Sequence, residues 1–95
     1  MIIRIVKIKS KVDHIENLKF LVKNELITLN QKYGCIFIYF LESVSVDNDS
    51  TLTLLSVWTD EKTLLKMKNS ADYFSLTEKI NLFVESITDN LYRYI

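Results

Sequence analysis

The chain has 95 residues, of which 48% are hydrophobic, a length and composition that suit one globular domain spanning residues 1–95. Twelve Lys and Arg balance twelve Asp and Glu, which argues against the basic surface of proteins that bind nucleic acid or anionic membranes. No apolar stretch approaches the roughly 18 residues that a membrane-spanning helix needs, so a membrane protein is not expected either.

Residues 2–9 alternate with period two and are rich in β-branched side chains, which predicts a strand. The basic residues of this region alternate with apolar ones, and we interpret them as the solvent-facing side of the strand. They are Arg4, Lys7, Lys9 and Lys11. The sequence opens directly on this strand without a signal-peptide pattern, so we expect a soluble, cytoplasmic protein.

A long helix is predicted next, from Asp13 to about Tyr33. Asp13 is the expected N-cap, with Glu16 three residues later completing a capping box. Apolar residues then recur every three or four positions and form one helix face. They are Ile15, Leu18, Val22, Leu26, Leu29 and Tyr33. Gly34, the only glycine, fits the left-handed position that ends a helix.

Two further strands are predicted at residues 35–46 and 50–58, joined by a polar hairpin loop at residues 47–50. The loop lacks the glycine and the distal glutamate of a calcium-binding loop, so a plain turn is expected. The single cysteine, Cys35, excludes an internal disulfide and a metal site built from several cysteines. It stands in an apolar run, which favours a small core residue over a reactive thiol.

The second half of the chain predicts two short helices and a closing strand. Asp60 or Thr59 caps the first helix, and Ser70 caps the second. The apolar face of the second helix consists of Tyr73, Leu76, Ile80, Phe83 and Val84. Residues 86–95 alternate again and predict the last strand.

The predicted order is β-α-β-β-α-β, which indicates a ferredoxin-like α+β fold with both helical layers on one face of a four-stranded antiparallel sheet. The strands are apolar on both sides. In residues 50–58, for example, Leu52 and Leu54 fall on one side of the strand, and Leu55 and Val57 fall on the other. Strands of this kind are buried on both faces. The helices can cover only one face, so we expect a homodimer in which sheet packs against sheet.

The segment 54–74, LLSVWTDEKTLLKMKNSADYF, joins a strand ending in Val57-Trp58 to an acid-rich cap, a short helix, a break and a second helix. Upstream, residues 29–43 form a helix end, a glycine and a strand. Together these features resemble the antibiotic biosynthesis monooxygenase family of dimeric α+β barrels, and the resemblance covers essentially the whole chain. The superfamily also includes isomerases, haem-degrading enzymes and proteins of other roles.

The resemblance implies a cofactor-independent, metal-free monooxygenase that acts on a small aromatic or quinol-type molecule between helices and sheet. Such a substrate passes an electron to O₂ once it has lost a proton, so a base is expected on the inner side of a helix. Glu25 falls inside the apolar face of the first predicted helix. A carboxylate held there would be desolvated and thereby suited to accept a proton.

We therefore predict Glu25 as the catalytic base and Tyr73 as the residue that orients the substrate by a hydrogen bond. Trp58, Met67 and Asp72 are the predicted substrate contacts. A structural role is open for each: Glu25 could lie on the helix flank and pair with a lysine such as Lys19 or Lys32. Trp58 could be a structural aromatic, and Tyr73 a core residue whose hydroxyl reaches the pocket edge.

Several positions depart from the family pattern. In members of the family that this chain resembles, a histidine often stands where this chain has Glu25. A glutamate is common where it has Ser56, and a second histidine where it has Asp72. This leaves open a non-catalytic, dimeric small-molecule-binding or regulatory protein, or an isomerase or lyase. The haem-degrading branch needs an asparagine, a tryptophan and a histidine where this chain has Lys7, Met67 and Thr77, so haem degradation is not expected.

Overall fold

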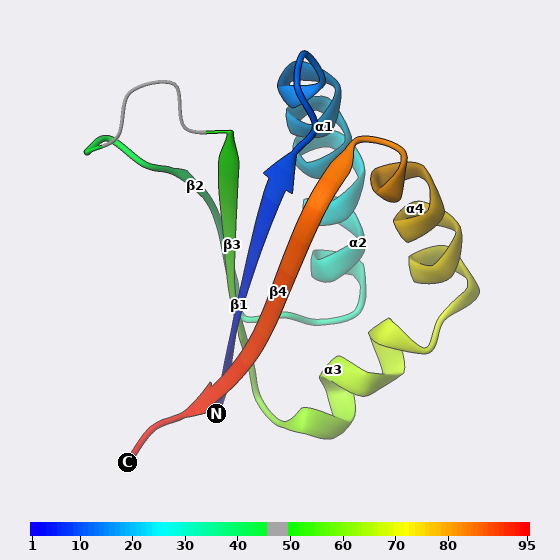
Figure 1. Cartoon of the computed structure of the whole chain (residues 1–95). Helices are drawn as coiled ribbons and strands as arrows, with labels where there is room; N and C mark the ends of the chain where they lie inside the picture. Colours follow the sequence, from blue (N-terminus) through cyan, green and yellow to red (C-terminus); the bar gives the residue numbers. More distant parts are fainter. Residues whose placement is uncertain (46–49) are drawn as a thin grey trace.

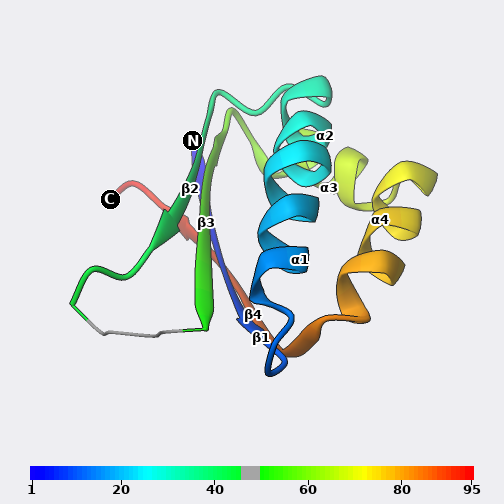
Figure 2. The same cartoon turned by 90° about the horizontal axis from the view of Figure 1, so that it is seen from above.

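The computed structural model describes residues 1–45 and 50–95 and has the predicted α+β architecture, a four-stranded antiparallel sheet with all helices on one face (Figures 1 and 2). The elements are β1 Ile2–Ser10, α1 Ile15–Leu21, η1 Val22–Leu26, α2 Ile27–Lys32, β2 Phe37–Glu42, β3 Thr51–Trp58, α3 Glu61–Lys68, α4 Ala71–Asn81 and β4 Val84–Arg93. The strand order β2-β3-β1-β4 is that of the ferredoxin-like fold, so this prediction is confirmed. No helix among the described residues is long and apolar enough to span a membrane.

The core lies between the helices and one face of the sheet. In the antiparallel register Val6 is opposite Leu54 and Ile8 is opposite Leu52, so their side chains point to the same face. The helices cover this face with the apolar residues that the periodicity predicted. The buried cluster consists of Val6, Ile8, Leu18, Val22, Leu26, Leu29, Leu52, Leu54, Trp58, Leu64, Met67, Leu76 and Ile80.

The opposite face of the sheet carries a second group of apolar side chains. None of the helices in residues 1–45 and 50–95 covers this face (Figure 2). Two rows cross the four strands in register. The first row is Phe37, Val57, Ile3 and Tyr92, and the second is Tyr39, Leu55, Ile5 and Asn90. Phe37, Tyr39 and Tyr92 are 56%, 52% and 51% exposed. At the other end the same face is mostly polar: Lys7 lies between Thr53 and Thr88, and Leu41 of β2 is opposite Thr53. We call the apolar residues of these two rows the outer apolar patch.

Three of the predicted helix signals are confirmed. Gly34 has φ +95°, a left-handed conformation that ends the first helical segment. The Asp60 side chain accepts a hydrogen bond from the backbone N–H of Thr63, and the Ser70 side chain accepts one from the backbone N–H of Tyr73. Each cap satisfies a donor that the first turn of the helix leaves without a partner.

The predicted N-cap Asp13 is wrong. Asp13 has φ 64° and lies in the turn before the helix, and His14 occupies the cap position without a side-chain hydrogen bond. A capping box requires an extended backbone at the N-cap residue. Asp13 has a left-handed backbone and is therefore part of the turn.

Two strand boundaries also differ from the prediction. β2 is shorter than residues 35–46, because Cys35 and Ile36 precede it and Val44, beyond its end, is 97% exposed. β4 begins at Val84, two residues before the predicted start. The predicted loop residues 47–49 lie outside the described residues.

Candidate functional site

A buried arginine lies at the centre of the candidate site. Arg4 lies in β1, and its side chain is only 4% exposed. Its interpretation as a solvent-facing residue is wrong, because Arg4 shares the helix-facing side of β1 with Val6 and Ile8. Lys7 and Lys9 do point to solvent. An arginine in such a place requires partners for its charge and its donors.

Asp89 of β4 is the main partner of Arg4. The Arg4 Nε donates to Asp89 Oδ1 at 3.0 Å, and Arg4 Nη2 donates to Asp89 Oδ2 at 2.8 Å, which is the bidentate geometry of a strong ion pair. Asp89 is opposite Val6 in the register, two residues along β1 from Arg4. Lys68 of α3 adds a third contact, with Nζ 3.3 Å from Asp89 Oδ2.

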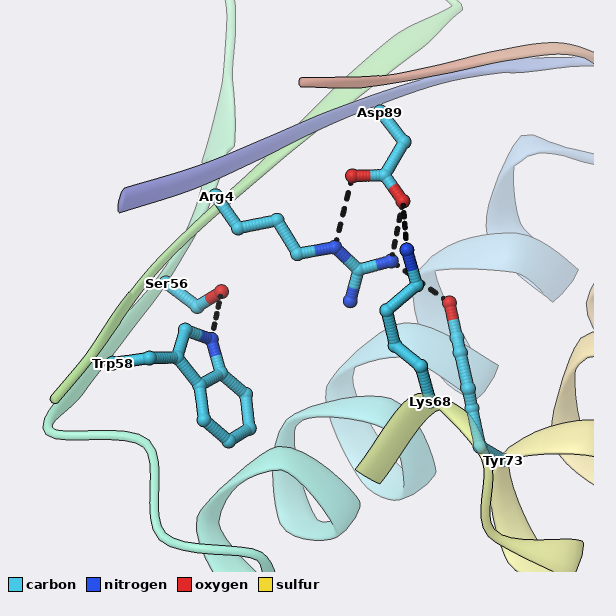
Figure 3. Close-up of polar contacts among 6 residues, drawn as sticks. All are labelled: Arg4, Ser56, Trp58, Lys68, Tyr73 and Asp89. Atoms are coloured by element: carbon cyan, nitrogen blue, oxygen red, sulfur yellow. Dashed lines mark hydrogen bonds and ion pairs between the residues drawn. The ribbon is translucent and has the colours of Figure 1, made fainter. Parts of the chain in front are cut away.

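Tyr73 of α4 completes the cluster. Arg4 Nη2 also donates to the Tyr73 hydroxyl oxygen at 2.8 Å, and the Arg4 guanidinium carbon lies 5.7 Å from the centre of the Tyr73 ring. Figure 3 shows the guanidinium between Asp89 and Tyr73, with Lys68 reaching the same carboxylate. Four elements, β1, β4, α3 and α4, therefore meet at one polar cluster: Arg4, Lys68, Tyr73 and Asp89.

The charges of the cluster stabilise one another. Partial burial favours the neutral form of Asp89, but the hydrogen bonds and positive charges of Arg4 and Lys68 outweigh it and hold the pKa of Asp89 below its ordinary value. Burial likewise opposes the charged form of Arg4, yet Asp89 and Tyr73 raise the Arg4 pKa above its ordinary value. The Arg4–Asp89 ion pair is therefore present across the physiological pH range.

Apolar side chains flank the cluster on β4. Ile87 and Leu91 lie two residues to either side of Asp89, so all three share the helix-facing side of the strand. Ile87 is 45% exposed and Leu91 is 40% exposed, because β4 is an edge strand that the helices cover only in part. The cluster thus opens toward solvent beside an apolar strip.

The structure places Trp58 and Met67 in the core, and neither has exposed surface. The Trp58 Nε1 donates to Ser56 Oγ at 2.9 Å (Figure 3). Ser56 precedes Trp58 by two residues and lies on the same face of β3, so its hydroxyl oxygen can accept the hydrogen bond of the buried indole N–H. Of the five predicted site residues, only Tyr73 belongs to the polar cluster.

Glu25 and Asp72 instead form ion pairs at the protein surface. The Glu25 side chain is 41% exposed and pairs with Lys79 of α4 at 3.5 Å, so the expectation of a desolvated carboxylate is wrong. The prediction assumed about 100° of rotation per residue. Glu25 lies in η1, a π-helical turn that is wider than an α-helix, and this spacing does not hold there. Asp72 pairs with Lys32 at 3.1 Å and is 56% exposed.

Two grooves lie on the surface of the helical layer. The larger, about 750 Å³, runs between the first helical segment and β2, with Phe20, Ile27, Phe40 and Leu52 among its lining residues and the Lys19–Glu42 ion pair at its rim. The other, about 590 Å³, lies between α1 and the end of α4. None of the five predicted site residues lines either groove.

Sequence reasoning missed Arg4, Lys68 and Asp89. A usable signal was present for two of them: Arg4 stands in the apolar series Ile2, Val6, Ile8, and Asp89 stands between Ile87 and Leu91 at the same spacing. A charged residue in the apolar series of a strand points to a buried partner. The described residues contain no group of three or more His, Cys, Asp or Glu side chains that could hold a metal ion.

Comparison with known proteins shows the fold. No protein-family model and no curated protein matches the chain. A putative antibiotic biosynthesis monooxygenase from Nitrosomonas europaea has a TM-score of 0.84 and 19% identity over 100% of this chain and 99% of that one. A putative antibiotic biosynthesis monooxygenase from Deinococcus radiodurans has a TM-score of 0.86 and 14% identity over 99% and 92%. SnoaB, a cofactor-independent oxygenase from Streptomyces nogalater, has a TM-score of 0.84 and 10% identity over 99% and 92%.

The chain therefore has the fold of the antibiotic biosynthesis monooxygenase structures along its whole length. The family resemblance seen in the sequence agrees with this finding. At these identities the likeness concerns the fold, and the chemistry has to be argued from this chain's own residues.

Proposed function

We propose that this chain binds a small aromatic, phenol- or quinol-type molecule at the cluster of Arg4, Lys68, Tyr73 and Asp89, and acts on it as a cofactor-independent monooxygenase. The shared fold supports this proposal, because two of the compared structures are named as putative antibiotic biosynthesis monooxygenases and one as a cofactor-independent oxygenase.

The orientation of the Tyr73 hydroxyl carries the proposal. Arginine has only donors, so the Tyr73 oxygen must accept the bond from Arg4. The hydroxyl proton of Tyr73 then remains available to a third group, and no described residue accepts it. An oxygen atom of the substrate would accept this bond, which gives Tyr73 the orienting role predicted from the sequence.

The overall reaction balances without a cofactor. A phenol with a free para position and one O₂ give the para-quinone and one water. The ionised phenol passes one electron to O₂, the resulting pair of radicals combines to a peroxide on the ring carbon, and loss of water leaves the second carbonyl. The protein has to bind the ring, favour loss of the phenolic proton and exclude bulk water.

The other predicted residues keep their roles as predictions. Glu25 would act as the base only if it released Lys79 and turned toward the substrate. Trp58 and Met67 would contact the ring only if α3 shifted outward, and Asp72 would have to release Lys32. The present geometry favours Tyr73 and Arg4 over these four residues.

Oxygen uptake with a panel of 1-naphthols and other phenols that have a free para position tests the proposal. We expect uptake by the wild type and a loss of roughly tenfold or more in Tyr73→Phe, which keeps the ring and removes the hydroxyl. Tyr92→Phe, on the opposite face of the sheet, is the matched control. Uptake that survives in Tyr73→Phe would contradict the role of Tyr73, and Glu25→Gln tests the predicted base in the same assay.

A second function is favoured by the burial of the site. Arg4 is 4% exposed and the indole of Trp58 has no exposed surface, so a ligand in this conformation would lie at the outer side of the cluster, beside Ile87 and Leu91, and would not be enclosed. A non-catalytic, small-molecule-binding or regulatory protein would have the same features. Binding of a naphthol without oxygen uptake would favour that function.

We also propose that the chain forms a homodimer through the outer apolar patch. A second copy would bury Phe37, Tyr39 and Tyr92, whose exposed rings are otherwise unfavourable in water. The polar end of the same face would remain hydrated at the edge of such an interface.

A further inference from the structure

We infer that α4 is a lid: the helix swings away from the sheet about its junctions with α3 and β4, and its opening gives a small molecule access to Arg4. The inference rests on the proposed function only for the identity of that molecule. The motion itself belongs to the protein and can be measured without a ligand.

The present position of α4 restricts access to the polar cluster. The Arg4 side chain is 4% exposed, and Tyr73 of α4 lies beside its guanidinium, with the hydroxyl oxygen 2.8 Å from Arg4 Nη2 (Figure 3). Outward movement of α4 would carry Tyr73 away from Arg4 and uncover the guanidinium. Closure would return the hydroxyl to the bound molecule and exclude water from it.

Few apolar side chains hold α4 to the core. Of its eleven residues only Leu76 and Ile80 are buried. The first helical segment, by contrast, buries four apolar residues, Leu18, Val22, Leu26 and Leu29. Elements with few buried apolar contacts open at a lower free energy than the rest of the core, so we expect α4 to open before the first helical segment does.

Two exposed ion pairs join α4 to the first helical segment. Asp72, near the start of α4, lies 3.1 Å from Lys32, and Lys79, near its end, lies 3.5 Å from Glu25. The four side chains are between 41% and 65% exposed. Exposed pairs contribute little to stability and are screened by salt, so they hold the closed position and release it readily.

The surroundings of α4 leave room for this movement. A groove of about 590 Å³ lies between α1 and the end of α4, and Phe20 and Leu82 on its walls are 65% and 66% exposed. Residues 69–70 and 82–83 are the only links from α4 to α3 and β4 (Figure 1). Short connections at the ends of a rigid helix can absorb a hinge motion. We expect α3 to stay in place, because Leu64 and Met67 have no exposed surface.

Thiol labelling of the full chain tests the inference, because a cysteine beneath α4 reacts only when the helix opens. In the Cys35→Ser background, Leu76→Cys should react with a disulfide reagent roughly tenfold or more faster than Leu18→Cys, at urea concentrations too low to unfold the protein. Adding Lys79→Gln removes one ion pair and should accelerate labelling at position 76 by about twofold to fivefold. Lys66→Gln, at an exposed position of α3, is the matched control and should have no effect.

Circular dichroism verifies that each variant is folded, and Ile80→Cys reports on the same opening if Leu76→Cys is not. Equal labelling at positions 76 and 18, or equal effects of Lys79→Gln and Lys66→Gln, would overturn the inference. Opening of α4 without oxygen uptake would support the lid and contradict the monooxygenase. Oxygen uptake by a chain that protects position 76 as well as position 18 would do the reverse.

Discussion

Arg4 places a positive charge in the largely apolar interior of this protein. Removing a guanidinium from water costs several kcal/mol, and in a folded protein this cost is offset only when hydrogen bonds and an opposite charge replace the water. Arg4 has both, through two bonds to Asp89 and one to Tyr73. A hydrophobic residue of similar size would cost less to bury.

At the residue scale, Asp89→Asn should lower the free energy of unfolding by about 2 kcal/mol at pH 7, because it removes the charge that balances a buried Arg4. The pKa of Asp89 is lowered in the folded state, so its ionised form contributes stability above the ordinary carboxyl pKa of about 3.9. This contribution is lost as the pH falls through the lower folded value. Urea unfolding at several pH values should show the two proteins converging in acid.

Asp72→Asn provides the control for that measurement. Asp72 pairs with Lys32 on the surface, where both side chains are more than half exposed. Exposed pairs contribute little to stability, so this variant should stay close to wild type. If Asp72→Asn lowered the free energy of unfolding as much as Asp89→Asn does, the buried pair would contribute no more to stability than an exposed pair.

At the scale of elements, the junction of α3 and α4 positions the Tyr73 side chain. The Ser70 hydroxyl donates to the carbonyl of Met67 at 2.7 Å and accepts from the backbone N–H of Tyr73 at 3.1 Å. One side chain thus ties the end of α3 to the first turn of α4. This explains why the sequence breaks its helix here instead of continuing it.

We predict that Ser70→Ala destabilises the protein by about 1 kcal/mol, the usual cost of losing an N-cap side chain. Ser75→Ala, at an exposed position within α4, should have a neutral or slightly favourable effect, since alanine is the better helix former. Urea denaturation midpoints of both variants check this. Equal midpoints for wild type and Ser70→Ala would show that the cap is not needed.

At the scale of the whole molecule, the sheet has apolar side chains on both faces, and the helices of the described residues cover only one of them. The outer apolar patch occupies one end of the second face, while Lys7, Thr53 and Thr88 make the other end polar. A partner copy should therefore sit over the apolar end and not over the whole sheet. The exposed aromatic residues of this patch are the places where a charge would disrupt the interface without disturbing the core.

Phe37→Lys should convert the proposed dimer to a folded monomer at micromolar concentration, because a lysine in the patch would be desolvated without a partner. Light scattering gives the mass, and circular dichroism verifies that the fold is intact. Thr88→Lys, on the polar end of the same face, should remain dimeric. A wild-type chain that is monomeric, or a Phe37→Lys variant that still dimerises, would contradict the proposed interface.

Much of the fold was predictable because its signals are local. The period of two in β1 and β3, the helical spacing from Leu18 to Leu29, and the caps Asp60 and Ser70 depend on residues a few positions apart. Two of the errors arose where a local irregularity interrupts the pattern. The π-helical turn changes the rotation at Glu25, and the left-handed backbone of Asp13 removes it from the cap position.

The sequence by itself therefore determined the order of elements and most of the core, since periodicity and capping report on neighbouring residues. Only the tertiary structure decided which polar groups meet, because Arg4 and Asp89 are 85 residues apart and come together through the pairing of the first and last strands. No spacing along the chain encodes that contact. It follows from the ferredoxin-like topology, which places β1 beside β4 and packs α3 and α4 against the same edge of the sheet.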